Sequence, residues 1–242
     1  VIQRSRVGQA AGVLLAVALF IGCQSTALTS AKLYVQQEHW DKAAEQLQVV
    51  VEQTPTDGEA WMLLAVARAN LSQFNEAGQA FSRAVAFPAQ QEEASRLRRG
   101  FWVKSFNSGV DALGQNDFEA AVEAFSAAQA IDESNDDASR NLAFAYYQMD
   151  RTQDAIDVYR KILEMSPDDE DTAVRLGYLY FNEEDFVNAA ALLAAPGQGS
   201  TDPQLLGALA TSYQALDREA DALAVIETAM SAGVANVNML LE

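Results

Sequence analysis

A period of about 34 residues runs through the sequence and constrains the fold more than any other feature. In two repeats that abut without a gap, small and large residues return in the same order: Leu142, Ala143, Tyr146 and Ala155 are followed by Leu176, Gly177, Tyr180 and Ala189. The small residues allow two antiparallel helices to approach closely, and the large ones fill the seam between them. This pattern at this period indicates a solenoid of helix–turn–helix units.

Six such repeats can be followed along the chain, beginning near Gln24, Gly58, Trp102, Asp136, Glu170 and Pro203. Pro55 and Pro167 stand where second helices should end, because proline lacks the N–H that a helix interior needs. N-caps for the following helices are offered by Thr56-Asp57 and by Asp168-Asp169, and Asp202 is a further expected cap. No segment shows the alternation of a strand. The sequence therefore predicts an all-α fold.

These recurring residues resemble those of the tetratricopeptide repeat family. The resemblance implies a right-handed solenoid of about six repeats. It also implies a function in binding other proteins rather than in chemistry. In this family the first helix of each pair lines a concave face, where peptide partners usually lie.

The chain carries 34 acidic and 16 basic residues, a formal net charge of −18. Such a surface repels phosphate backbones, which argues against a nucleic-acid partner. An acidic excess also keeps an elongated protein soluble, and adaptation to a salt-rich habitat is a second explanation.

The N-terminus has the features of a secretion signal. Arg4 and Arg6 precede an apolar run of about a dozen residues, which is short for a membrane-spanning helix and ends at Cys23. Phe20 to Cys23 resembles the bacterial lipobox, although Phe20 replaces the usual leucine. The resemblance implies a signal peptide over residues 1–22 and a membrane anchor through acylated Cys23. Gln24 then implies an outer-membrane lipoprotein facing the periplasm. Alternatively, this single cysteine is incidental and the protein is secreted without an anchor.

The repeats are interrupted in two places. Residues 92–101 separate repeats 1–2 (residues 23–91) from repeats 3–6 (residues 102–236), and they form either an extension of the next helix or a hinge; their helix-forming composition favours the extension. Residues 195–200 replace the last helical turn of the fifth repeat. Residues 237–242 are either a C-terminal cap or a truncated helix.

Catalytic and metal-binding patterns are not found. His39 is the single histidine, and it is most simply a surface residue. The acidic clusters fall between helices, where caps are expected, and none has the spacing of a calcium loop. No glycine-rich loop has the context of a phosphate site. We therefore expect a protein that is not an enzyme, with no cofactor, no metal and no small-molecule substrate.

Register with the family assigns a partner groove on the first helices of the middle repeats. Its expected residues are Phe106, Asn107, Val110, Arg140, Asn141, Phe144, Tyr147, Val174, Tyr178 and Phe181. Aromatic side chains with a few fixed polar groups suit a protein or peptide partner. At helical spacing, each single aromatic can equally belong to the core. The lysine and asparagine clamp that some family members use for a C-terminal carboxylate is absent.

Four basic residues gather near the insert: Arg96, Arg98, Arg99 and Lys104. They form either a solvated helix face that pairs with nearby glutamates or a dock for an acidic protein or lipid phosphates. The layout as a whole is similar to that of repeat lipoproteins that assist assembly of envelope complexes. The sequence thus predicts a lipid-anchored binding scaffold; the alternative is a targeting subunit or regulator for a cell-wall enzyme.

Overall fold

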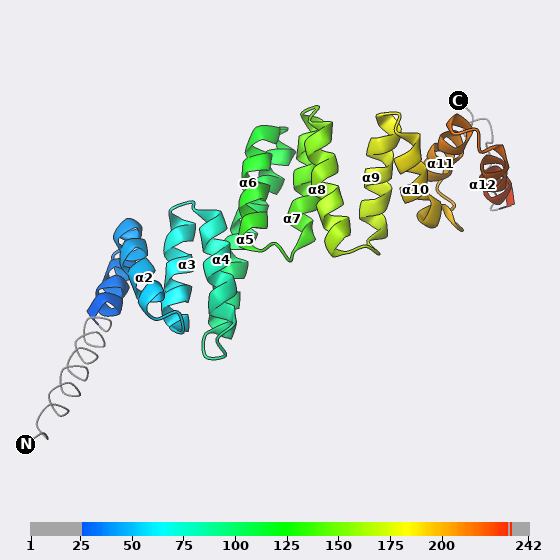
Figure 1. Cartoon of the computed structure of the whole chain (residues 1–242). Helices are drawn as coiled ribbons and strands as arrows, with labels where there is room; N and C mark the ends of the chain where they lie inside the picture. The colour runs from blue at the N-terminus through cyan, green and yellow to red at the C-terminus, as the bar shows by residue number, and fades with distance from the viewer. Residues whose placement is uncertain (1–25, 232, 234–242) are drawn as a thin grey trace, which may run out of the picture. The chain divides into compact units, whose positions relative to one another are not determined.

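The computed structural model describes residues 26–231 and residue 233. It divides into two compact units, which are described separately: unit 1 comprises Val1–Asp111 with Glu123–Asn135, and unit 2 comprises Ala112–Val122 with Asp136–Glu242. The regular elements of the described residues are all helices (Figure 1). The predicted all-α solenoid of helix–turn–helix repeats is confirmed. The expected signal peptide, Cys23 and residues 237–242 lie outside the described residues.

The described part of unit 1 starts with helical residues 26–36, followed by α2 (Trp40–Gln53), α3 (Gly58–Asn70) and α4 (Phe74–Val85). It also contains most of α5 (Gln91–Gly114) and of α6 (Phe118–Ile131). Unit 2 contains α7 (Asp136–Gln148), α8 (Thr152–Met165), α9 (Glu170–Asn182), α10 (Phe186–Gly197), α11 (Pro203–Ala215) and α12 (Glu219–Ser231). In Figure 1 the helices of each unit lie as successive side-by-side pairs.

Small residues bring the helices into close contact, as the repeat pattern requires. Ala65 and Ala77 of the second repeat are fully buried. At Gly78 of α4, an added Cβ would lie only 1.9 Å from the carbonyl oxygen of Ala130 in α6. At Gly177 of α9, an added Cβ would lie 2.5 Å from a Leu193 methyl. Glycine at these positions permits helix–helix approaches that a larger residue would prevent.

The predicted caps are confirmed at Asp202 and at the second residue of each pair, Asp57 and Asp169. The side chains of Asp57, Asp169 and Asp202 accept hydrogen bonds from the backbone N–H groups of Ala60, Thr172 and Gln204. Each bond satisfies one of the donors that the first turn of a helix leaves free. The cap at Asp202 is followed by Pro203 in the first helical turn, where the missing N–H carries no cost.

Residues 92–101 lie within the continuous helix α5. Ala94 is buried, and Leu97 and Phe101 pack against the core formed by α2, α3 and α4. The helical turns of residues 92–101 are therefore stabilised by packing against this core.

The prediction that residues 195–200 replace the last helical turn of the fifth repeat is only partly correct. Helix α10 continues through Gly197 and includes Pro196. Proline costs little here, since it removes one hydrogen bond in the final turn rather than in the interior. Gly197 then packs directly on α11, where an added Cβ would lie 2.7 Å from a Leu209 methyl. No helix in the part of the chain described here is both long enough and apolar enough to cross a membrane.

Candidate functional site: an exposed aromatic face on α7

The expected groove residues fall in both units, so each part is considered by itself. In unit 1, Val110 of α5 is 46% exposed and Asn107 is also exposed. Phe106 is different, because its ring stacks on Trp102 at a centroid distance of 4.7 Å and meets Phe125 edge-on at 5.5 Å. Phe106 therefore belongs to a half-buried aromatic cluster, and α5 exposes two valines, Val103 and Val110, instead of an aromatic surface.

In unit 2, two aromatic side chains of α7 remain accessible. Phe144 is 40% exposed and Tyr147 is 39% exposed. Residues three apart on a helix lie on the same face, so the two rings are neighbours. Their other neighbours in α7, Leu142, Ala143 and Ala145, are buried. The helix thus places its aliphatic residues in the core and leaves a pair of large aromatic residues at the surface.

Contacts at both ends show that α7 and α9 lie side by side and run in the same direction. Near their N-termini, Arg140 of α7 donates to Asp169 and Thr172 at the start of α9. Near their C-termini, Asn182 of α9 donates through Nδ2 to the Tyr147 hydroxyl oxygen at 3.3 Å. We call the exposed side chains Phe144, Tyr147 and Asn182 the α7–α9 face.

Arg140, which was expected to line the groove, forms its contacts within the protein. Besides its bonds to Asp169 and Thr172, it pairs with Asp137 at 3.2 Å. The hydrogen bond with Asp169 is the main reason that the pKa of Arg140 is raised. Burial opposes ionisation of Asp169, but the hydrogen bonds from Arg140 and Thr172 outweigh it and lower the pKa of that carboxyl. Arg140 therefore joins two repeats.

The other polar and aromatic groove residues are also partly used by the fold. Asn141 donates its side-chain N–H to the Asp137 carbonyl oxygen of its own helix. Val174, Tyr178 and Phe181 of α9 are half-buried and pack against the apolar core of α10 and α11. The Tyr178 hydroxyl is buried without a hydrogen-bond partner, and burial raises its pKa, with a further contribution from Asp202. Tyr178 and Phe181 are thus seam residues between repeats.

The four basic residues of α5 have different surroundings. Arg96 forms an ion pair with Glu93 at 2.6 Å, and Arg98 pairs with Asp132 at 3.4 Å. Arg99 and Lys104 are exposed. At about 100° per residue, Arg98 points to the opposite side of the helix from Arg96. The four side chains do not share one face.

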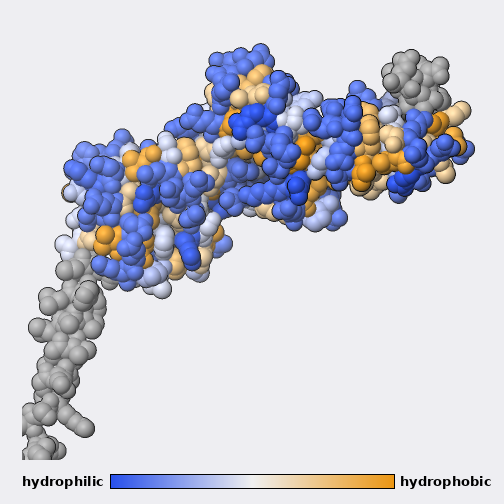
Figure 2. Space-filling model, turned by 45° about the horizontal axis from the view of Figure 1, so that its top comes forward, coloured by the Kyte–Doolittle hydropathy of each residue, from blue (hydrophilic) through white to orange (hydrophobic). Residues whose placement is uncertain are grey.

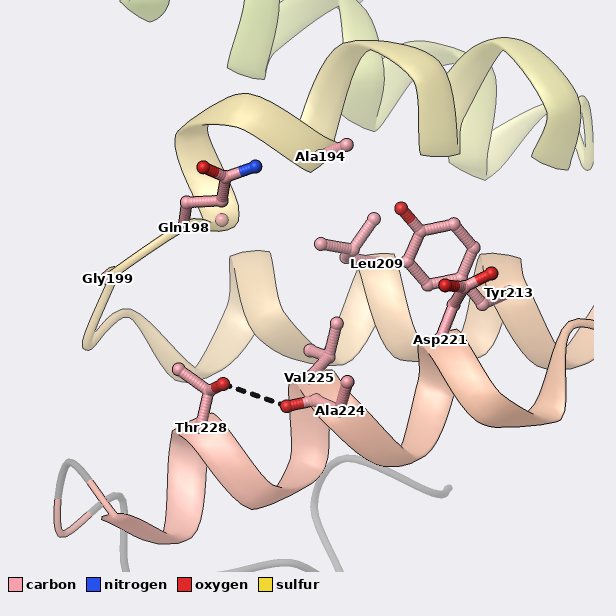
Figure 3. A pocket seen from close by; sticks show the side chains of 10 residues that line it. Ala194, Gln198, Gly199, Leu209, Tyr213, Asp221, Ala224, Val225 and Thr228 are labelled. Atoms are coloured by element: carbon pink, nitrogen blue, oxygen red, sulfur yellow. Dashed lines mark hydrogen bonds between the residues drawn. The ribbon is translucent and has the colours of Figure 1, made fainter.

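The structure also contains a pocket that the residue pattern alone did not predict. It has a volume of about 360 Å³ and lies in unit 2 between the end of α10 and α12. Figure 3 shows Leu209 and Tyr213 of α11 between these two elements, with Gln198 on the α10 side. The pocket coincides with the irregular residues 195–200, so the Pro-Gly interruption was the sequence signal for it.

Among the described residues, no group of three or more His, Cys, Asp or Glu side chains is placed to hold a metal ion. His39 is exposed at the start of α2. Figure 2 shows that hydrophilic residues cover much of the face it draws, with hydrophobic residues in smaller patches. Unit 2 therefore presents a polar surface that includes an exposed aromatic pair, an arrangement suited to binding.

Comparison with known proteins identifies the repeat. A family model described as "Tetratricopeptide repeat" matches residues 28–92 and again residues 106–170, which together are more than half of the chain. No curated protein matches the chain significantly.

Several solved structures resemble the chain at low identity. Pseudomonas aeruginosa pilF is 17% identical over 89% of this chain and 90% of its own, with a TM-score of 0.44. YrrB, described as a TPR protein with an unusual peptide-binding site, is 16% identical over 82% of this chain and 97% of its own, with a TM-score of 0.47. PilW, described as a type IV pilus biogenesis factor, is 14% identical over 91% and 99%, with a TM-score of 0.48.

Proposed function

The chain belongs to the tetratricopeptide repeat family, and on this basis we propose that it is a non-catalytic scaffold that binds a partner protein or peptide on the α7–α9 face. The exposure of Phe144 and Tyr147 carries this proposal. Aromatic side chains contribute a large contact area at a low entropic cost, and they are frequent among the residues that dominate binding energy.

The corresponding residues of the next repeat support this choice of site. Tyr178 and Phe181 of α9 are packed into the seam with α11, whereas Phe144 and Tyr147 are left open at equivalent positions of α7. Asn182 fixes the Tyr147 hydroxyl from one side. A ring held in place before binding loses less freedom when a partner docks.

The double variant Phe144→Ala/Tyr147→Ala tests the proposal. We expect it to weaken partner capture in a pull-down from the native cells by at least about tenfold, with an unchanged helical circular dichroism spectrum. The matched control is Val187→Ala/Leu223→Ala, which removes two exposed apolar side chains from the second helices α10 and α12. Equal capture by both double variants and the wild type would contradict the proposal.

We further propose that the scaffold is anchored at the outer membrane and faces the periplasm, where it assists assembly of an envelope complex. The support is the sequence of the N-terminus, with Arg4 and Arg6 before an apolar run that ends at Cys23. More than one acyl chain is needed for stable anchoring, as acylation of a lipoprotein cysteine provides.

Metabolic labelling with a palmitate analogue tests the anchor. We expect label on the wild type and on Phe144→Ala/Tyr147→Ala, and none on Cys23→Ser. Equal labelling of Cys23→Ser, or an unlabelled wild type, would refute the anchor and leave the binding face untouched.

A further inference from the structure

The two units differ in charge far more than in length. Unit 2 contains 21 acidic and six basic residues, whereas unit 1 contains 13 acidic and ten basic residues. Most of the net charge of −18 therefore belongs to the unit that carries the α7–α9 face. An acidic surface that served only solubility would have no reason to favour one unit.

Many of the carboxylates of unit 2 lie at the two ends of its first helices. Because α7 and α9 run in the same direction, their N-termini share one edge, which carries Asp136, Asp137, Asp168, Glu170 and Asp171. The opposite edge contains the turns after these helices, with Asp150, Glu183 and Glu184. The exposed aromatic pair lies on the helix between these edges.

The basic residues of unit 2 neutralise the N-terminal edge only in part. Arg140 and Arg175 pair with Asp137, Asp169 and Asp171. Arg151 pairs with Asp154 and also lies over the Tyr146 ring, 4.3 Å from its centroid. Within the described part of the chain, no ion pair involves Asp150, Glu183 or Glu184. The turn edge therefore keeps its negative charge.

We propose that the α7–α9 face binds a basic polypeptide segment, with apolar side chains of the segment on Phe144 and Tyr147 and its lysines or arginines at the two acidic edges. This inference rests on the proposed function and specifies the chemistry of the partner. Complementary charge steers association and excludes acidic competitors, while the aromatic contacts hold the bound segment.

Two synthetic peptides provide the probe. One alternates Lys and Leu, and the other replaces every Lys by Ser, which removes the positive charges together with the lysine stems, so the salt dependence identifies the part due to charge. Dissociation constants for the full chain are measured by isothermal titration calorimetry at about 0.05 M and about 0.3 M NaCl, because salt screens interactions between exposed charges. We expect the Lys peptide to bind more tightly than the Ser peptide, and to lose affinity at the higher salt concentration.

Two variants that each remove three negative charges, at different places in unit 2, show whether binding depends on the position of the charges or only on the net charge. The turn-edge variant is Asp150→Asn/Glu183→Gln/Glu184→Gln. The control variant, Asp157→Asn/Glu164→Gln/Glu227→Gln, removes three exposed charges from the second helices α8 and α12. We expect the turn-edge variant to weaken binding of the Lys peptide by about tenfold, since each exposed pair contributes a small amount, and the control by less than about twofold.

Equal effects of the two charge variants, or equal affinity for the two peptides, would overturn the inference. Retention of Lys-peptide binding by Phe144→Ala/Tyr147→Ala would overturn it as well. Each of these three results would leave the proposed function standing, provided that Phe144→Ala/Tyr147→Ala still failed to capture the native partner in the pull-down. If Phe144→Ala/Tyr147→Ala still bound both the native partner and the Lys peptide, the proposed function and this inference would both be refuted.

Discussion

The two units share one repeat pattern but differ in the exposure of their aromatic residues and in their charge. In the described part of unit 1 the large aromatic side chains are buried or half-buried, with Phe106 between Trp102 and Phe125, and the charges of the unit are nearly balanced. Unit 2 leaves Phe144 and Tyr147 exposed and carries a large acidic excess. The small residues at the packing positions are enough to form the repeat, so an aromatic residue on its first helix can lie either in the core or at the surface. From this difference between the units we propose that unit 2 is the one that binds a partner.

The largest expected effect concerns the close packing of unit 1. Gly78→Ala would place a Cβ against the Ala130 carbonyl, and the main chain cannot yield without moving a helix. We expect a loss of about 3 kcal/mol in the free energy of unfolding, measured by urea denaturation. The control is Gly100→Ala in α5, where an added Cβ meets nothing within 4 Å. It should stabilise the protein by about 0.5–1 kcal/mol, and a similar loss in both variants would contradict the packing argument.

In unit 2 the largest expected effect is on the polar link between repeats. Arg140→Met keeps much of the side-chain volume but removes the bonds to Asp169 and Thr172. We expect a loss of about 2 kcal/mol in the same denaturation experiment. Arg218→Met is the matched control, because Arg218 is half exposed, pairs with Asp221 and lies over the Tyr213 ring, both in its own repeat. A loss equal to that of Arg218→Met would show that Arg140 does not join the repeats.

A smaller effect is expected in acid. The pKa of the Asp169 carboxyl is lowered in the folded protein, so its ionised form stabilises the fold above the unfolded value of about 3.9. That contribution is lost as the pH falls through the lowered pKa. We therefore expect the stability difference between the wild type and Asp169→Asn to shrink below about pH 4, with asparagine still able to cap α9. A difference that is constant from pH 7 to pH 3 would contradict the assignment.

The smallest expected effect is at the turn after α9. Glu184 has a φ of 59°, a left-handed conformation that glycine adopts without strain. Glu184→Gly should stabilise the protein by about 0.5–1 kcal/mol. Glu183→Gly removes the same charge at a residue with a φ of −85°, so it should give no such gain. If Glu184→Gly and Glu183→Gly stabilised the protein equally, the gain would come from the loss of charge and not from the backbone conformation.

Much of the fold could be predicted from the sequence, but less of the site. Helix pairs followed from the 34-residue period, and the caps at Asp57, Asp169 and Asp202 followed from residue type and position. Register could not distinguish Phe144 from Tyr178, since both occupy the same position of their repeats. Which one is buried depends on the side chains of the following repeat, where α11 covers Tyr178.

The role of Arg140 shows the same limit. Its position suggested a groove residue, but its side chain reaches the first turn of the next repeat, and this contact depends on the distance between two helices. The continuation of α10 through Pro196 likewise depended on a packing partner, Leu209, that no local pattern reveals.

Site-specific photo-cross-linking in the native cells tests the central claim most directly. A benzophenone amino acid at position 144 lies on the α7–α9 face, and the same group at position 187 lies on the exposed side of α10 in the same unit. We predict that position 144 cross-links to a protein with a basic segment at the cross-linked site, and that position 187 does not. Cross-linking of a protein partner at position 187 but not at position 144 would contradict the account.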